Sequence, residues 1–287
     1  MKRSRFEYMR LFIAALFSIC AFAQPRNAIL IITDAEGVAG VCRQQQVEQG
    51  NAEMQRLLTG EINAAVRGFL KAGAPQVVVW DGHGGSWTLS AQTIHDDARL
   101  ITGSPGPKML LDSGRFAAIA FVGQHARANR ERAVMAHSYS SLGIQKLTMN
   151  GAEVGEIETR AALAGAFNVP VIFLSGDRAA AEDLHAIVPE AEVAIVKEGL
   201  SYYSCESMSA AGAQALIEKQ AEAAWRKLAR IKPYRVDGPV TIEMELTTRS
   251  TPSPDAVPGE GVERIGPRTL RYRGKDFLEA WTRWSGR

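Results

Sequence analysis

The stretch AILIITDAEG, residues 28–37, places two carboxylates directly after an apolar run. Residues 28–32 are typical of a short buried strand, and Asp34 and Glu36 follow it two positions apart. In an extended chain such side chains point the same way, so the carboxylates would repel each other unless a cation lay between them. The same residues could instead satisfy the backbone of a Gly-rich turn. The stretch therefore predicts a buried strand that ends at a cation site or at a turn.

Apolar runs alternate with helical patterns from residue 28 to about residue 229. Strand-like runs occupy residues 28–32, 76–80, 116–122, 171–174 and 193–196, and helical patterns occupy residues 54–69, 154–167, 178–187 and 209–229. Strands that alternate with helices favour a parallel sheet, because each crossover returns the chain to the same edge. The predicted fold class is α/β, with a mainly parallel sheet and helices on both faces.

The pattern changes after Pro233. Residues 240–246 and 268–273 alternate apolar and polar side chains, and a loop with three prolines lies between them at residues 251–261. A helical pattern follows at residues 275–284. This order predicts a small C-terminal strand-loop-strand-helix unit. The sequence therefore divides into an α/β domain over residues 24–232 and an α+β appendage over residues 233–287, which is a candidate assembly surface.

The N-terminus has the pattern of a signal peptide. Four basic residues precede the apolar run Leu11–Phe22, and Ala21-Phe22-Ala23 gives a small-x-small cleavage pattern before Gln24. We expect residues 1–23 to be removed and the mature chain to be periplasmic or secreted, without stable membrane association. The alternative is an uncleaved membrane anchor, but the apolar run is short for a transmembrane helix.

Charge and cysteine content restrict the partners and the chemistry. The full chain has a net charge of +2, of which residues 1–23 contribute +3, so the mature chain has a net charge of −1 and no nucleic-acid partner is expected. Cys42 and Cys205 could pair in an oxidising compartment or remain as buried thiols. The chain has no CxxC motif that would suggest a thiolate metal site.

Two histidines also follow predicted strands. His83 lies in Asp81-Gly82-His83 after the second strand, and His125 lies in Gly123-Gln124-His125 after the third. The carboxyl ends of parallel strands meet at one edge of a sheet, so we expect these imidazoles to lie near Asp34 and Glu36. Carboxylates with imidazoles suit zinc or a similar divalent ion. Each residue alone could be structural, and their shared placement carries the prediction of a metal site.

Five short motifs occur in order between residues 29 and 229. They are Asp34-x-Glu36-Gly37-x-x-Gly40, Asp81-Gly82-His83-Gly84, Gly123-x-His125-Ala126, Met135-x-His137-Ser138 and Asn150-Gly151-x-x-x-Gly155-Glu156. As a set they resemble the DppA-type D-aminopeptidases, a family of zinc metallopeptidases. The resemblance implies two zinc ions per chain, bridged by Asp34. It implies Glu36 and His83 as further ligands of one ion, and His125 and Glu156 as ligands of the other.

The resemblance also implies a mechanism and an assembly. His137 matches the catalytic histidine of the family, which forms a double pentameric ring with active sites facing an internal chamber. The function it implies is removal of N-terminal residues, including D-residues, from short peptides through a metal-bridging water. The alternatives are a metal-dependent amidase or esterase for another small substrate, and an exported metal- or peptide-binding protein without turnover. His137 favours catalysis over binding. The apparent signal peptide departs from the family pattern and leaves the physiological substrate open.

Overall fold

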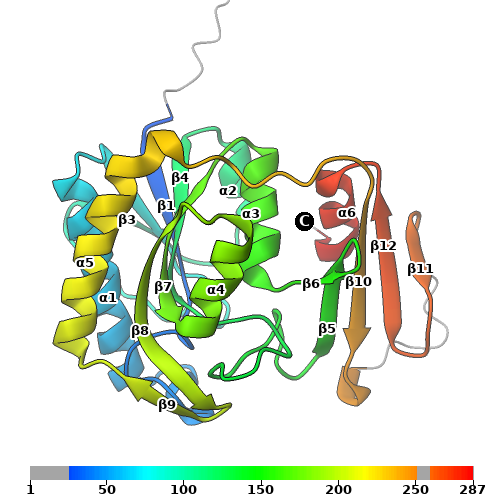
Figure 1. Ribbon diagram of the computed structural model, residues 1–287, viewed down its shortest axis with the longest axis horizontal. Coiled ribbons are helices and arrows are strands. Elements are labelled where there is room, and N and C mark those ends of the chain that lie inside the picture. Colours follow the sequence, from blue (N-terminus) through cyan, green and yellow to red (C-terminus); the bar gives the residue numbers. More distant parts are fainter. Residues whose placement is uncertain (1–25, 251–258, 287) are drawn as a thin grey trace, which may run out of the picture.

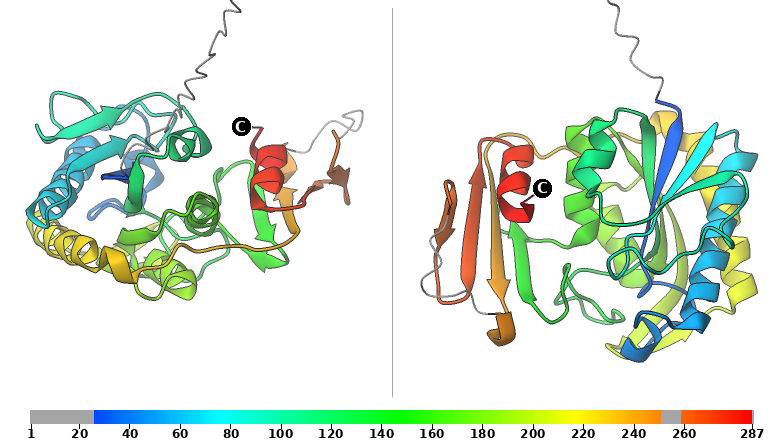
Figure 2. Two further views of the ribbon diagram at one scale, coloured as in Figure 1. Left: turned by 90° about the horizontal axis from the view of Figure 1, so that it is seen from above. Right: turned by 180° about the vertical axis from the view of Figure 1, so that it is seen from behind.

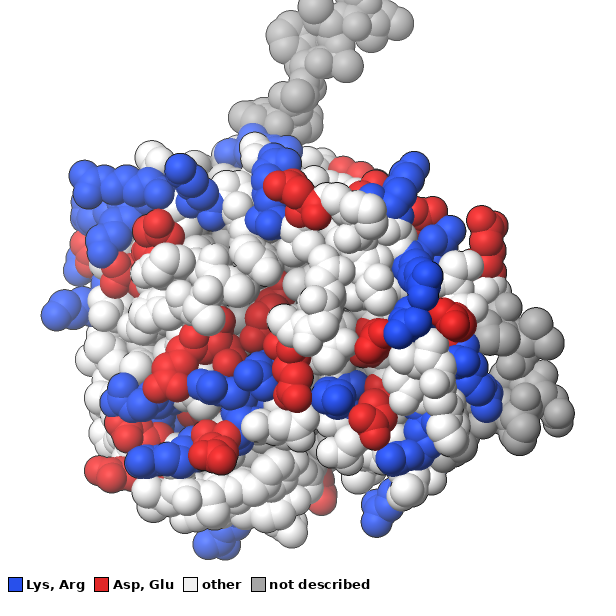
Figure 3. Space-filling view, turned by 45° about the vertical axis from the view of Figure 1, so that its right-hand side comes forward, with Lys and Arg blue, Asp and Glu red and all other residues white. Residues whose placement is uncertain are grey.

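The computed structural model describes residues 26–250 and 259–286 (Figure 1). The predicted signal peptide and most of the proline-rich loop lie outside the described residues. The chain forms two sheets, one of seven strands and one of five, with helices against both (Figures 1 and 2). In the face shown in Figure 3, basic and acidic side chains are interspersed, in keeping with the near balance of 33 basic and 31 acidic residues.

The larger sheet is almost entirely parallel, and only its edge strand β9 runs antiparallel. Its order is β3-β2-β1-β4-β7-β8-β9. The strands are β1 (Ala28–Thr33), β2 (Gln76–Trp80), β3 (Ala98–Ile101), β4 (Phe116–Gln124), β7 (Val171–Asp177), β8 (Glu192–Ser201) and β9 (Ser204–Ser207). The central strands β1, β4 and β7 are rich in Val, Ile and Phe, and all their residues except Ala117 are buried, as expected for a sheet covered on both faces.

Helices cover both faces of this sheet. Helices α1 (Ala52–Lys71) and α5 (Ala210–Lys227) pack together on one face, while α2 (Pro107–Asp112), α3 (Glu156–Ala166) and α4 (Arg178–Ile187) cover the other (Figures 1 and 2). Side-chain caps begin three of them, because Asn51, Asp177 and Ser209 accept hydrogen bonds from the first turns of α1, α4 and α5. The predicted α/β class is confirmed.

The order of strands reverses between β1 and β4. The chain moves outward from β1 to β2 and β3, then returns to β4 on the other side of β1 and continues to β7 and β8. Thr33 at the end of β1 pairs with Val122 near the end of β4, so the residues that follow the two strands are neighbours. Such a reversal opens a crevice at the carboxyl ends of the strands, where α/β proteins bind their ligands.

The second sheet is antiparallel and draws on two distant parts of the sequence. Its order is β11-β12-β10-β5-β6, and α6 (Phe277–Ser285) packs against it and contacts α3. The strands are β5 (Ile144–Met149), β6 (Ala152–Glu153), β10 (Val240–Leu246), β11 (Val262–Arg264) and β12 (Thr269–Gly274). The predicted C-terminal strands and helix are present. They are joined by β5 and β6, so the sheet uses residues on both sides of the predicted boundary at residue 232.

Several predicted bounds differ from the structure. The helix predicted from Val154 begins at Glu156, because Ala152 and Glu153 pair with β5 and Gly155 is the N-cap. Strands β4 and β7 extend to Gln124 and Asp177, beyond their apolar runs. These terminal polar residues stay in the ladder because they are buried beside the crevice.

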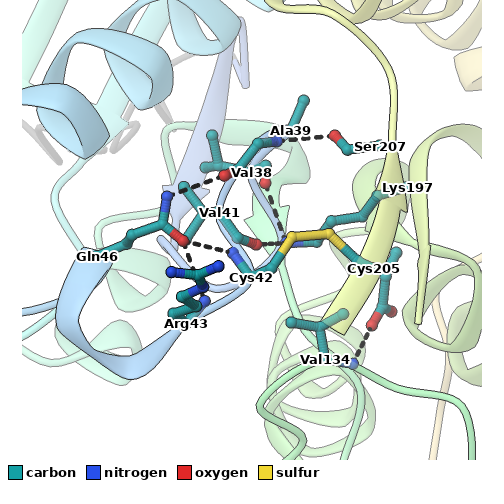
Figure 4. Close-up of a disulfide and its surroundings, with 12 residues drawn as sticks. Val38, Ala39, Val41, Cys42, Arg43, Gln46, Val134, Lys197, Cys205 and Ser207 are labelled. Atoms are coloured by element: carbon teal, nitrogen blue, oxygen red, sulfur yellow. Dashed lines mark hydrogen bonds between the residues drawn. A yellow bond between two sulfur atoms is a disulfide. The ribbon is translucent and has the colours of Figure 1, made fainter. Parts of the chain in front are cut away.

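A disulfide joins the loop after β1 to the edge of the larger sheet. Cys42 and Cys205 are bonded across a sequence separation of 163 residues (Figure 4). The sequence left their pairing open, and the structure pairs them. Among the described residues, the helices are all too short or too polar to cross a membrane.

Replacing both Cys42 and Cys205 with Ser is expected to lower the free energy of unfolding by about 2–5 kcal/mol, because the crosslink restricts a long loop in the unfolded chain. The urea midpoint of the wild type and the variant, without reductant, measures the loss. Dithiothreitol should lower the wild-type midpoint to that of the variant and leave the variant unchanged. Equal midpoints without reductant would contradict the stabilising role.

Candidate metal centre

The structure brings the five predicted ligand residues together at the reversal between β1 and β4. Asp34 and Glu36 follow β1, His83 follows β2, His125 follows β4, and Glu156 begins α3. Four of them are buried, with exposed fractions of 5% for Asp34, 6% for Glu36, 2% for His125 and 6% for Glu156. Asp34, Glu36, His83 and Glu156 border a cavity of about 410 Å³ that His137 also lines.

Asp34 lies between two groups of side chains. Its Oδ1 is 3.0 Å from His83 Nδ1, which is also 3.3 Å from Glu36 Oε2. Its Oδ2 is 3.4 Å from His125 Nε2, which is 3.5 Å from Glu156 Oε1. The cluster therefore has two halves that share one carboxylate, each half containing one further carboxylate and one imidazole.

Backbone carbonyls hold the far side of both imidazole rings. His83 Nε2 is 2.9 Å from the carbonyl of Val47, and His125 Nδ1 is 2.8 Å from the carbonyl of Ala126. A ring nitrogen that donates to a carbonyl carries the proton, so in the neutral ring the other nitrogen presents a lone pair. In both histidines that lone pair faces carboxylate oxygens.

Two polar atoms of the cluster are buried without a hydrogen-bond partner among the described residues. They are Glu36 Oε2 and His125 Nε2, one in each half. Lone pairs that face one another in a buried site repel, and a cation between them removes the repulsion. The donor set of carboxylate oxygens and imidazole nitrogens therefore fits divalent cations such as zinc in both halves.

The cluster has a strong demand for positive charge. Burial opposes protonation of His83, but the neighbouring carboxylates of Asp34 and Glu36 outweigh it and raise the pKa of His83 to about 12. Burial also opposes protonation of His125, yet Glu156 and Asp34 raise its pKa to about 10. Protons and divalent cations compete for such a site.

His137 lies beside the cluster, with its ring stacked on that of His125 at 4.0 Å between centroids and an interplanar angle of 16°. Its Nδ1 is 2.8 Å from the carbonyl of Met135, which leaves Nε2 as the free basic nitrogen. Met135 and Tyr139 on either side have φ angles of 47° and 63°, a strained conformation for non-glycine residues. The chain thus bends sharply on both sides of His137 and presents its ring to the cavity.

Two further polar side chains orient the carboxylates. Arg160 Nη2 is 2.9 Å from Glu156 Oε2, and Gln124 Nε2 donates to Asp34 Oδ2 at 3.1 Å. Neither role was predicted from the sequence. The four-residue spacing of Glu156 and Arg160 on one helix face was the available signal.

Lys197 on β8 holds the loop after β1 in place. The side chain is buried, and its Nζ donates to the carbonyls of Val38 and Val41 (Figure 4) and to that of Glu36. A buried ammonium needs such acceptors, so the loop that carries Glu36 is fixed to β8.

Two buried acids shape loops around the cluster. Asp81 Oδ2 accepts hydrogen bonds from the backbone of Thr88 and Leu89, so it forms the turn that carries His83. Glu61 of α1 is 2% exposed, and its Oε1 accepts a hydrogen bond of 2.8 Å from the backbone of Ala39. Burial raises the pKa of Glu61 to about 7, although the Ala39 hydrogen bond and the Lys197 charge oppose the rise.

A doubly wound α/β sheet with this cluster at its switch point, and a free imidazole beside it, is the arrangement of a metal-dependent hydrolase. The profile of the D-aminopeptidase peptidase family matches residues 28–285, and the chain belongs to that family. The curated D-aminopeptidase of Bacillus subtilis (strain 168) is 28% identical over 254 residues, which cover 86% of this chain and 92% of the relative.

A solved structure agrees with the sequence match. It is described as the Zn-dependent D-aminopeptidase DppA from Bacillus subtilis, a self-compartmentalizing protease. Its similarity to this chain has a TM-score of 0.79 and 26% sequence identity, and covers 90% of this chain and 96% of that one. The similarity thus extends over both sheets.

The difference in the free energy of unfolding between Glu61→Gln and the wild type is expected to shift in favour of the variant as pH increases. The pKa of Glu61 is about 7 in the folded chain and near 4.5 when solvated, so its stabilising contribution is complete below pH 4.5 and is lost as pH rises through 7. The uncharged Gln avoids this loss, which is on the order of 3 kcal/mol. Urea midpoints between about pH 5 and pH 8 should diverge. The exposed Glu53→Gln on the same helix should give a constant difference, and a constant difference for Glu61→Gln would refute the buried-acid interpretation.

Proposed function

We propose that this protein is an exported aminopeptidase with two zinc ions per chain, which removes N-terminal D-residues from short peptides. The observation that carries the proposal is the position of Asp34. Each of its two oxygens faces a different imidazole, and each imidazole belongs to a half of the cluster that has one further carboxylate. Family membership and the zinc dependence of the Bacillus subtilis protein support it. In this assignment Asp34 would contribute to the binding of both ions, Glu36 and His83 would complete one ligand set, and His125 and Glu156 would complete the other.

The residues of this chain divide the work of peptide hydrolysis. When bound, two divalent ions lower the pKa of a water between them and polarise the scissile carbonyl. Arg160 and Gln124 hold the carboxylates of Glu156 and Asp34 in place. His137 keeps its proton on Nδ1, against the Met135 carbonyl, so its Nε2 can accept a proton from the attacking water and pass it to the leaving amine.

We also propose a homo-oligomer. The description of the Bacillus subtilis structure as a self-compartmentalizing protease supports an assembly that encloses its active sites, and the ten-subunit ring is the form that the motif resemblance implies. A protein exported by the predicted signal peptide would meet cell-wall fragments or external peptides as substrates.

Purified mature protein is expected to hold close to two zinc ions per chain and to hydrolyse D-aminoacyl peptides. Elemental analysis and a panel of D- and L-aminoacyl peptides, amides and esters test both statements. Removal of the metal with a chelator should abolish turnover, and zinc should restore it. Full activity of metal-free protein would exclude the two-metal mechanism, and metal binding without turnover of any panel member would identify a binding protein.

His137→Ala is expected to lower kcat by about 10²–10⁴-fold, because the free imidazole transfers the proton in the rate-limiting chemistry. Metal content should stay near that of the wild type, since the five ligand residues are intact. His185→Ala is the matched control, because His185 lies on α4 and hydrogen-bonds the Ala191 carbonyl, away from the cluster. Retention of wild-type kcat in His137→Ala would remove the catalytic assignment.

A further inference from the structure

A second cavity, of about 660 Å³, adjoins the metal centre. It is bordered by residues of α2, α6 and the end of β2. Four residues line both this cavity and the metal-site cavity, namely Gly82, Gly85, Tyr139 and Arg160. A group bound at the metal centre can therefore extend directly into the larger cavity. Its volume is in the range of sites that bind small organic ligands.

Four aromatic residues contribute to the walls of this cavity, which Lys108 and Asp112 also line. Trp80, Tyr139, Trp281 and Trp284 line it together with Pro105 and Met109. Trp284 meets Tyr139 edge to face at 4.8 Å and Trp281 at 5.3 Å between ring centroids. Packed rings of this kind form a preformed apolar surface that favours a flat, bulky side chain. The metal centre beside it is polar, so the two cavities would bind chemically different parts of one ligand.

Arg160 lies where the two cavities meet. Its side chain is 8% exposed, and its guanidinium carbon is 5.9 Å from the ring centroid of Trp80 and 5.7 Å from that of Tyr139. Nη2 pairs with Glu156, while Nε and Nη1 are buried without a hydrogen-bond partner among the described residues. Unsatisfied donors on a buried guanidinium are costly, and a carboxylate is their best-matched acceptor.

We propose that the aromatic cavity binds the C-terminal residue of a dipeptide, with an aromatic side chain against the tryptophans and its free carboxylate beside Arg160. This proposal rests on the proposed function, which places the scissile carbonyl at the metal centre. The C-terminal carboxylate of a dipeptide lies one residue beyond that carbonyl, and one residue spans at most about 3.6 Å. Arg160 pairs with Glu156, which is one of the proposed metal ligands, so its guanidinium lies next to the metal centre. A longer peptide would place an uncharged amide there.

Three substrates test the proposal on the wild-type enzyme. The first is D-alanyl-phenylalanine, with whichever configuration at phenylalanine is hydrolysed faster. The other two are the C-terminal amide of that dipeptide and D-alanyl-glycine. We expect kcat/KM for the better phenylalanine dipeptide to exceed that for D-alanyl-glycine by about 10- to 100-fold, from burial of the ring. The amide should be slower by about 10-fold or more, from loss of the charge-assisted contact. Equal rates for all three would overturn this proposal and leave the aminopeptidase function standing, whereas no hydrolysis of any would overturn both.

Variants separate the cavity from general effects on folding. Ser104 is exposed at the cavity and Thr102 is exposed two residues earlier without lining it, so Ser104→Trp should remove the preference for phenylalanine over glycine and Thr102→Trp should retain it. Arg160→Lys should lower the rates of both acid and amide and also reduce their ratio. If Arg160 only positions Glu156, the two rates fall equally and the ratio is unchanged. An unchanged ratio, or an unchanged preference in Ser104→Trp, would overturn the proposal.

Discussion

The burial of the Asp34 carboxylate between two imidazoles is the constraint on which the rest of the site depends. A buried charge is tolerated only where counter-charges and hydrogen bonds replace water. Asp34 receives both, from His83 on one oxygen and from His125 and Gln124 on the other. Three strand ends must therefore stay in register, because β1, β2 and β4 each deliver one of these groups. The reversal of strand order between β1 and β4 provides the crevice in which they meet.

The loop after β1 is held by parts of the chain that come much later in the sequence. Lys197 on β8 donates to three of its carbonyls, Glu61 on α1 accepts from Ala39, and the disulfide from Cys42 ends on β9. These contacts fix the backbone that carries Glu36. The far edge of the sheet thus contributes to the geometry of the metal centre without supplying a ligand.

The sequence predicts the parts of the site that follow apolar strands. Asp34, Glu36, His83 and His125 were placed by that rule, and the structure puts them side by side. Glu156 and His137 were reached only through the motif resemblance, because the chain leaves the first sheet after His125 and builds β5 and β6 before returning to α3. The role of Lys197 could not be predicted from the sequence, because a lysine after a strand is usually solvated and only the folded chain shows the three carbonyls that surround it.

Tyr139 connects the second sheet to the metal centre. Its backbone N–H donates to Glu156 Oε1 at 3.2 Å, its hydroxyl is 2.7 Å from Thr159 Oγ1, and its ring packs on Trp284 of α6. The segment from His125 to Glu156 leaves the larger sheet and forms β5 and β6 of the second, so the orientation of His137 and Glu156 depends on the packing of α6 against α3. The C-terminal segment therefore does more than extend the α/β domain. Through Tyr139 it helps to position the Glu156 carboxylate, and through its tryptophans it supplies one wall of the neighbouring cavity.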